Sequence, residues 1–562
     1  MTDTNNIGSN AGPVVVFGID GAAPEVVHDL ISKGSLPNLK RLIEGGTWGH
    51  LQSTVPPITG PAWVSFMTGA NPGQHGVGDW MVRQSEDYQL APIDASHVKA
   101  PTFWQIAGKQ SRRSAVINVP VTYPPRPVNG ALVGGILSPR DGSVFTYPSD
   151  LTSQLLAQVP DYRSHLSSFY VPGQLDPFLK DLGELVECRK QAASWMLKQN
   201  RWDFFMVHFM ATDWAQHALW HCIDPEHPSY NLEEAEACGD GIRQVYESVD
   251  TAIGELLPQL PEDATIILMS DHGFGGLHRY IYLNNWLLDK GYMRLKRDPL
   301  TQAKHLLFRA GVTPANLYAL MSRLGLVGRA FGATRKSRYQ LLKTFFLSSQ
   351  NIDWKRTRAY SFGNIGQIYL NVKGREPEGI VEPGAEYDEL REELITEMKN
   401  MRDPENDQLL IEDVRRREDV YTGPHSEKMA DILLLPDGLR TQAAGLSEFM
   451  SNSVLESSFA YTGGHRMNGL TVLNGPNIQP GKELSWAEII DLAPTILYLM
   501  GVPVPESMDG KVLTEAFDND HVAAHPVAMT DETFSVDDEG TGLSQEEAKD
   551  VTERLRALGY VT

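Results

Sequence analysis

Residues 14–21 read Val-Val-Val-Phe-Gly-Ile-Asp-Gly, a short apolar run that stops at a carboxylate and a glycine. A continuous run of this length, rich in β-branched residues, is typical of a parallel strand that is covered on both faces. The same pattern recurs at 202–209, which is followed by Asp213, and at 265–269, which is followed by Ser-Asp-His-Gly at 270–273. Three predicted strands therefore each end near a polar side chain.

The carboxyl ends of these strands are expected to share one edge of an open sheet. Loops that leave this edge converge, and helix amino termini point toward it, so open α/β sheets bind their ligands there. A further strand is predicted at 469–473, directly after Gly-Gly-His at 463–465, and a late helix at 491–500. The pattern predicts an α/β fold with a mostly parallel central sheet.

The length of 562 residues exceeds what one hydrophobic core fills, since single cores stop growing at roughly 250–300 residues. We expect one core formed by residues 12–290 and 450–518. Residues 291–449 change to basic, helix-rich sequence and then to a strand-like stretch, which predicts an inserted cap. Residues 519–562 are an acidic tail that ends in a short helix, opened by a capping box at 544–547.

The formal charge of −22 argues against binding of nucleic acid polymers or anionic membranes, because both interactions depend on Lys and Arg. The start of the chain has no secretory signal, and no apolar run reaches membrane-spanning length. Cys188, Cys222 and Cys238 are few, odd in number and not in a CxxC spacing, so they predict neither a disulfide framework nor a thiolate zinc site. We therefore expect a cytoplasmic protein.

Six side chains in these segments are carboxylates or imidazoles of the kind that bind zinc or manganese without sulfur. They are Asp20, Asp213, His217, Asp271, His272 and His465. Asp213 and His217 are four residues apart, which places both on one face of a helical turn. His221 continues this face, and we interpret it as a neighbour of the site rather than a ligand. Singly, such residues are more often helix caps or core histidines, so the combination is what predicts a metal site.

Thr59 is the candidate nucleophile. It lies in Pro-Pro-Ile-Thr-Gly-Pro-Ala-Trp at 56–63, where Pro61 suits a first helical turn. Thr59 would then lie beside free backbone N–H groups, which favour an alkoxide or a bound phosphoryl group. The alternative is that Thr59 only caps the helix, which is the commoner role of a Thr in this position. The predicted metal ligands favour the nucleophile.

These residues occur in an order that resembles the alkaline phosphatase superfamily, specifically its type I phosphodiesterase/nucleotide pyrophosphatase branch. The matching elements are Gly-Ile-Asp-Gly at 18–21, Thr59, Asn-Pro-Gly-Gln-His-Gly at 71–76, Asp213-x3-His217, Asp271-His272-Gly273, His465 and Asp-Leu-Ala-Pro-Thr at 491–495. The similarity covers about residues 13–135, 200–290 and 455–515. The resemblance implies a three-layer α/β/α sandwich and a metal-dependent phosphate ester hydrolase.

The resemblance also implies two divalent ions, zinc or alternatively manganese. One ion would be held by Asp213, His217 and His465, and the other by Asp20, Asp271, His272 and Thr59. Such a pair lowers the pKa of a hydroxyl group and stabilises both oxygens of an in-line displacement. A phosphothreonine at Thr59 would form and then be hydrolysed.

The chain departs from its relatives next to Thr59. Nucleotide pyrophosphatases carry an Asn shortly after the nucleophile, where this chain has Gly-Pro-Ala-Trp at 60–63, so nucleotide diester specificity is not implied. The Cys/Ser-x-Pro-x-Arg motif of sulfatases is also missing here. We expect cleavage of a phosphodiester or phosphomonoester of a small metabolite, with Trp63 and Arg466 as candidate substrate contacts. The alternatives are a phosphomutase or phosphotransferase, as in cofactor-independent phosphoglycerate mutase, and a non-catalytic metal-binding homologue.

Overall fold

The computed structural model describes residues 12–83, 87–139, 143–167, 170–171, 174–323, 345–445, 449–458, 461–536 and 542–557. Within these residues, the buried apolar side chains form two hydrophobic cores. The larger core surrounds a central sheet and takes in residues from both ends of the chain. The smaller core begins at Ile281 and ends at Phe449.

The central sheet has the strand order β20-β2-β19-β9-β1-β8-β5-β6-β7 in the described part of the chain. These strands are β1 Val14–Ile19, β2 Thr47–Gln52, β5 Ser114–Ile117, β6 Gly130–Val133, β7 Thr146–Tyr147, β8 Phe204–Phe209, β9 Thr265–Met269, β19 Asn468–Asn474 and β20 Lys482–Glu483. The strands from β9 to β6 run parallel, whereas β19 is antiparallel to both neighbours and β7 is antiparallel to β6. The predicted mostly parallel α/β fold is therefore confirmed.

Strand β1 lies inside this sheet because its side chains suit burial on both faces. It pairs with β8 from Val14–Phe204 to Ile19–Phe209, and with β9 on its other side. Every residue of β1 and of β8 is buried. Gly18 is required by close packing, since a Cβ at this position would lie 2.6 Å from Cη2 of Trp63. The strand therefore delivers Asp20 to the sheet edge with a tryptophan packed against its last residues.

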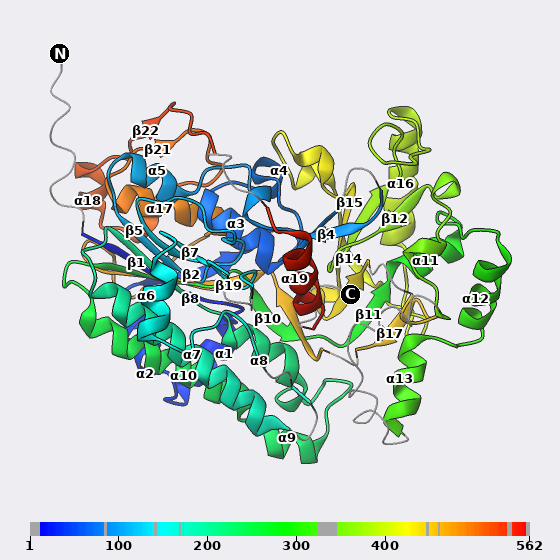
Figure 1. Ribbon diagram of the computed structural model, residues 1–562, viewed down its shortest axis with the longest axis horizontal. Helices are drawn as coiled ribbons and strands as arrows, with labels where there is room; N and C mark the ends of the chain where they lie inside the picture. Colours follow the sequence, from blue (N-terminus) through cyan, green and yellow to red (C-terminus); the bar gives the residue numbers. More distant parts are fainter. Residues whose placement is uncertain are drawn as a thin grey trace.

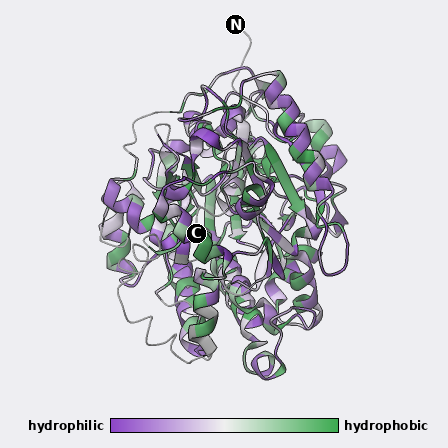
Figure 2. Cartoon of the chain, turned by 90° about the vertical axis from the view of Figure 1, so that its right-hand side faces the viewer, coloured by the Kyte–Doolittle hydropathy of each residue, from purple (hydrophilic) through white to green (hydrophobic). Residues whose placement is uncertain are grey.

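Helices cover both faces of the sheet, which gives the three layers that the sequence predicts (Figure 1). One face carries α1 Pro24–Ser32, α2 Pro37–Glu44, α7 Leu175–Leu197, α8 Ala211–Leu219 and α10 Gly241–Leu256. The other face carries α3 Thr59–Thr68, α5 Phe103–Lys109 and α17 Leu492–Leu499. In Figure 2 the strands inside the molecule are mainly hydrophobic, whereas the outer helices alternate hydrophilic and hydrophobic turns. This alternation is the amphipathic pattern of helices that pack on a sheet.

The smaller core has sheets of its own. One sheet has the order β12-β13-β15-β14 and the other the order β16-β11-β17. Their strands are β12 Ala359–Ser361, β13 Gln367–Leu370, β15 Ile432–Pro436, β14 Ile411–Arg416, β16 Thr441–Ala444, β11 Arg279–Tyr282 and β17 Leu455–Ser457, with helices α11 Leu283–Lys290, α12 Pro299–Arg309, α13 Pro314–Arg323 and α16 Ala385–Lys399. We propose that this part is the inserted cap. Its predicted limits, 291–449, stay a prediction.

A two-stranded ribbon lies where the chain passes between the two cores. Strand β10, Gly273–Gly276, pairs antiparallel with β18, Gly463–Arg466. The ribbon is contiguous with the predicted metal-site motifs, since β10 follows Asp271 and His272 directly and β18 contains His465.

The C-terminal residues return to the larger core. Strand β22, Met529–Thr530, pairs with β21, Val504–Pro505. Helix α19, Gln545–Ala557, begins after Ser544, whose hydroxyl accepts from Glu547 N–H, while Ser544 N–H donates to the Glu547 carboxylate. The capping box is therefore formed as its sequence indicates. Across the described residues, no helix combines the length and apolar character that crossing a bilayer requires.

Candidate metal centre

The predicted ligands reach one edge of the central sheet from five separate segments. Asp20 follows β1, Asp213 and His217 lie on α8 after β8, Asp271 and His272 connect β9 to β10, and His465 lies in β18. Thr59 is the first residue of α3. Asp20, Thr59, Asp213, Asp271, His272 and His465 are buried, and His217 is half-buried. The structure thus brings all seven residues together.

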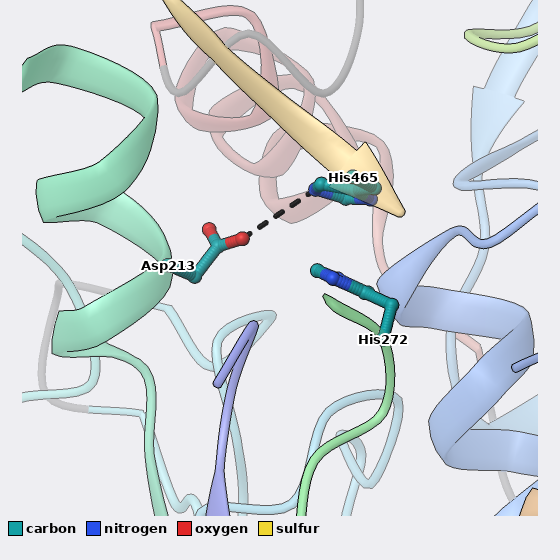
Figure 3. A group of neighbouring side chains, drawn as sticks. All are labelled: Asp213, His272 and His465. Atoms are coloured by element: carbon teal, nitrogen blue, oxygen red, sulfur yellow. Dashed lines mark ion pairs between the residues drawn. The ribbon is translucent and has the colours of Figure 1, made fainter. Parts of the chain in front are cut away.

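One group of atoms surrounds Asp213. The carboxylate Oδ1 of Asp213 lies 3.4 Å from His217 Nε2 and 3.4 Å from His465 Nε2. The two imidazole Nε2 atoms are 3.1 Å apart. Figure 3 shows Asp213, His272 and His465 approaching one another from α8, the β9–β10 connection and β18. These side chains offer ligand atoms that lie within 4.8 Å of one another.

A second group surrounds His272. Its Nε2 lies 3.2 Å from Asp271 Oδ2 and 3.7 Å from Asp20 Oδ1. The hydroxyl oxygen of Thr59 is 3.1 Å from the same nitrogen. The rings of His272 and His465 stack with centroids 3.6 Å apart, so the two groups adjoin. Thr59 makes no capping hydrogen bond to α3, for which Ile58 is the residue at the cap position. The alternative role of Thr59 as a helix cap is therefore not the arrangement found here.

The hydrogen bonds of the three histidines orient their ligand nitrogens. Nδ1 of His217 contacts Gly463 O at 2.8 Å, Nδ1 of His272 contacts Gly273 O at 3.0 Å, and Nδ1 of His465 contacts Pro57 O at 2.7 Å. A carbonyl oxygen only accepts, so each Nδ1 donates its N–H. In a neutral ring, Nε2 then presents a lone pair. Backbone carbonyls commonly hold metal-binding histidines in this way.

The pKa shifts of the clustered side chains indicate that their carboxylates need a positive charge nearby. Burial, followed by repulsion from Asp271 and Asp213, raises the pKa of Asp20 well above its usual value. Burial and the neighbouring Asp213 likewise raise the pKa of Asp271. Burial opposes ionisation of Asp213 too, but His217 and His465 hold its pKa well below the usual value. Burial also lowers the pKa of His272 and of His465.

Two carboxylate oxygens support the same reading. Asp20 Oδ1 and Asp271 Oδ2 are buried and have no hydrogen-bond partner among the described residues. Buried polar atoms are normally paired, because leaving one unpaired is costly. A divalent cation between these oxygens and the Nε2 atoms would satisfy both the geometry and the charge. The residues present therefore fit a metal centre.

Asp20 is held by neighbours that the sequence did not single out. His208 Nε2 lies 2.9 Å from Asp20 Oδ2, and Thr212 Oγ1 donates to Asp20 O at 2.6 Å. His208 comes from the otherwise apolar strand β8 and is buried. The only signal in the sequence was that His208 is a polar residue inside an apolar strand. Such a pattern does not indicate that the side chain contacts Asp20.

Trp63 was predicted as a substrate contact, and the structure places it inside the core. Its side chain is 0% exposed, and its indole N–H donates to Asp20 Oδ2 at 2.9 Å. Its ring also packs edge-on against His208, with centroids 4.6 Å apart. In this arrangement Trp63 orients a candidate metal ligand, and the substrate contact stays a prediction.

Arg466, the other predicted substrate contact, lies at a cavity wall. Its guanidinium donates to backbone carbonyls, including Leu439 O at 2.8 Å and Gly276 O at 2.6 Å. Burial, followed by repulsion from Arg440, lowers the pKa of Arg466 to about 10. The cavity, of about 840 Å³, is lined by Phe274 as well, whose ring lies against His217 with centroids 4.8 Å apart. The ring of Phe274 therefore lies between this cavity and the cluster of candidate metal ligands.

Two residues beside the candidate ligands have other contacts. His221, interpreted from the sequence as a neighbour rather than a ligand, is not among the clustered ligands; its Nδ1 lies 3.0 Å from Thr462 Oγ1 and its Nε2 3.3 Å from the Glu234 carboxylate. Gly273 directly follows His272, and its φ is not in the left-handed region. The glycine is needed because a Cβ would lie 2.1 Å from Asn468 O. Close packing against β19, and not a turn, excludes a side chain there.

Comparison with known proteins identifies the family to which this geometry belongs. The sequence profile described as type I phosphodiesterase/nucleotide pyrophosphatase matches residues 14–442. The chain belongs to this family. Membership makes it a phosphoric ester hydrolase of the alkaline phosphatase superfamily.

Solved structures are similar to this phosphodiesterase family member at low sequence identity. Phosphonoacetate hydrolase from Sinorhizobium meliloti 1021, in complex with phosphonoacetate, is 15% identical with a TM-score of 0.52, over 87% of this chain and 95% of that chain. Human ectonucleotide pyrophosphatase/phosphodiesterase 5 is 14% identical with a TM-score of 0.48, over 90% of this chain and 100% of that chain. The first of these similarities supports the alkaline phosphatase-like fold.

Proposed function

We propose that this enzyme cleaves a phosphate ester of a small metabolite with Thr59 as nucleophile and two divalent metal ions. The observation that carries the proposal is the position of Thr59 Oγ1, 3.1 Å from His272 Nε2, at the start of α3 and within the cluster of six candidate ligands. A threonine that only caps a helix is not expected to contact a buried histidine of a candidate metal site. The contact therefore favours a chemical role.

The candidate ligands divide into two sets in the proposed centre. Asp213, His217 and His465 would hold one ion, and Asp20, Asp271 and His272 would hold the other together with Thr59. Three imidazoles and three carboxylates without sulfur suit zinc, with manganese as the alternative. When bound, the ions supply Lewis-acid stabilisation of the charge that develops on the phosphoryl oxygens.

The protein's own groups would carry out two displacements. Thr59 Oγ1 attacks phosphorus, so that a P–O bond to Thr59 forms and the ester bond to the leaving alcohol breaks. Water then attacks the phosphothreonine, which regenerates the Thr59 hydroxyl and releases the phosphate product. Thr59 is the first residue of α3, and the positive end of the helix dipole there would favour negative charge on a phosphoryl group bound beside it. Burial of the cluster keeps bulk water away from these charges.

A substrate panel tests the proposal directly. Purified enzyme with zinc or manganese is assayed with bis-p-nitrophenyl phosphate, p-nitrophenyl phosphate, the sulfate analogue and phosphonoacetate, the last because a protein of similar fold is a phosphonoacetate hydrolase. We expect turnover of a phosphate ester and acid-stable phosphate on Thr59 after rapid quenching. Turnover of the sulfate ester alone would contradict the proposal. Transfer of nearly all phosphate to an added alcohol would replace hydrolysis by phosphotransfer.

A further inference from the structure

Two of the three cysteines lie side by side in the fold. Cys222 ends the short 3-10 helix η2, Trp220–Cys222, and Cys238 ends α9, Leu232–Cys238. Their sulfur atoms are 2.9 Å apart, and the residues are only 5% and 3% exposed. Sixteen positions separate the two cysteines along the chain, so no CxxC-type spacing revealed the pair.

The distance between these sulfur atoms is unusual for two thiols. Non-bonded carbon atoms rest about 3.5–4.0 Å apart, and sulfur is larger than carbon. A disulfide bond is about 2.05 Å long, so a small approach of the two side chains is enough to form one. A shared zinc ion would instead keep the sulfurs roughly 3.8 Å apart, since each Zn–S bond is about 2.3 Å in tetrahedral geometry. The two sulfur atoms therefore lie within reach of a direct bond.

The surroundings of the pair favour an uncharged group. Cys238 Sγ donates to Glu234 O at 2.8 Å, and the Glu234 carboxylate accepts from Tyr170 OH at 2.8 Å. Burial, followed by Cys238 and Glu234, raises the pKa of the Cys222 thiol. Thiolates are thus disfavoured in this pocket, which argues against a thiolate metal site, since a metal binds cysteine as the thiolate. A disulfide carries no charge and needs no counter-ion here.

We propose that Cys222 and Cys238 form a reversible disulfide bond when the protein meets a low-molecular-weight disulfide. Exchange forms the Cys222–Cys238 S–S bond and breaks the S–S bond of the small disulfide, whose two sulfurs take up the two electrons and the two thiol protons to become two thiols. In a reducing compartment the pair stays a dithiol.

The bond would tie down the segment that follows the metal-site helix. Helix α8 runs directly into η2, so Cys222 lies a few residues after His217. His221 contacts Thr462 Oγ1, and Thr462 N–H donates to His217 O at 2.9 Å. Cross-linking Cys222 to Cys238 closes the loop 223–237 beside these contacts. A closed loop restricts the unfolded chain, so the oxidised protein is expected to be more stable.

The third cysteine supplies a matched control. Cys188 lies on α7, where its Sγ contacts Leu185 O at 3.3 Å. Cys188→Ser should leave the oxidation of the pair unchanged. Cys222→Ser and Cys238→Ser should each prevent the internal disulfide.

The experiment compares full-length protein equilibrated with oxidised glutathione or with dithiothreitol, both in the folded state and during refolding, where burial does not limit access. After denaturation, we expect one free thiol per chain in the oxidised sample and three in the reduced one. Peptide mapping without reductant should give a Cys222–Cys238 peptide two hydrogen masses lighter than the separate peptides. The melting temperature should rise on oxidation for the parent and for Cys188→Ser, and not for Cys222→Ser. Three free thiols under both oxidising conditions, or a bond to Cys188 instead, would overturn the proposal. None of these readouts depends on the proposed catalytic function.

Discussion

The oxygen of Thr59 is the atom on which the proposed chemistry depends. Thr59→Ala removes it and leaves the six other candidate ligands in place. We expect kcat to fall by roughly 10³-fold or more, with metal content unchanged, because the covalent route closes while the ions stay bound. Steady-state kinetics and elemental analysis of the same preparation check both statements. Thr59→Ser keeps the hydroxyl and is expected to retain part of the activity. Parent-like turnover in Thr59→Ala would show that water attacks directly.

Trp63 donates a hydrogen bond to Asp20, so a substitution of Trp63 tests whether this contact positions Asp20 for metal binding. Trp63→Phe removes the N–H that donates to Asp20 Oδ2 and keeps an aromatic ring in the core. Loss of such a supporting contact is expected to weaken metal affinity by about 10–100-fold. Activity measured against buffered free metal separates this effect from a loss of kcat.

Trp104→Phe is the matched control for this substitution. Trp104 is also buried, on α5, and stacks on Phe204 at 6.4 Å. It should lose a similar amount of packing and keep the parent metal affinity. Equal metal affinity in both variants would mean that Trp63 serves packing alone.

Close packing of a helix on a strand can be tested at Gly18. A Cβ there would lie 2.6 Å from Trp63 on α3, so Gly18→Ala must push α3 away from β1. Such overpacking is expected to lower the free energy of unfolding by about 1–3 kcal/mol, measured by denaturant titration. Gly183→Ala, inside α7 with open space around its Cβ position, is the control. It should be neutral or stabilising by up to about 1 kcal/mol. Equal effects of the two substitutions would contradict the packing argument.

The elements differ in how far their sequence reveals them. Strands β1, β8 and β9 were predictable because each is a mainly apolar run, and buried parallel strands have this pattern. Strand β7 has two residues, too few for any periodicity. The strand order was also beyond prediction, since it depends on how the helices pack the strands together. The candidate site residues at strand ends could therefore be recognised in the sequence, whereas the strand order that brings them together could not.

The proposed metal centre joins parts of the whole molecule from Asp20 to His465. The ligand types and their order could be predicted, because few other combinations of Asp and His occur after strands. The contacts that orient these candidate ligands could not be predicted from the sequence. His208, Thr212 and the carbonyl of Pro57 are ordinary residues in the sequence and gain a role only through folding.

Metal and pH are expected to act together on the stability of the whole molecule. Asp20 and Asp271 have raised pKa values in the metal-free fold, so both bind protons more tightly when folded than when unfolded. Their contribution to metal-free stability is therefore present below the usual carboxyl pKa of about 4 and is lost as pH rises through the raised values. A metal ion displaces these protons, so metal affinity should increase as pH rises.

Thermal unfolding with and without zinc, between about pH 5 and pH 8, measures this linkage. The rise in melting temperature caused by zinc should grow with pH. His272 and His465 contribute little to this trend above pH 6.5, because burial already keeps them neutral. A zinc effect that is constant over the range would contradict protonated carboxyls in the metal-free cluster.

The ribbon of β10 and β18 also bears on how the family diversifies. It brings the point where the chain leaves the core next to the point where it returns. A segment with both ends anchored at one place behaves like an exchangeable cassette, because its length and content can change without moving either anchor. For the proposed cap, this arrangement would let its length and content vary while the ribbon keeps both anchors in place, so new specificities could arise without rebuilding the larger core.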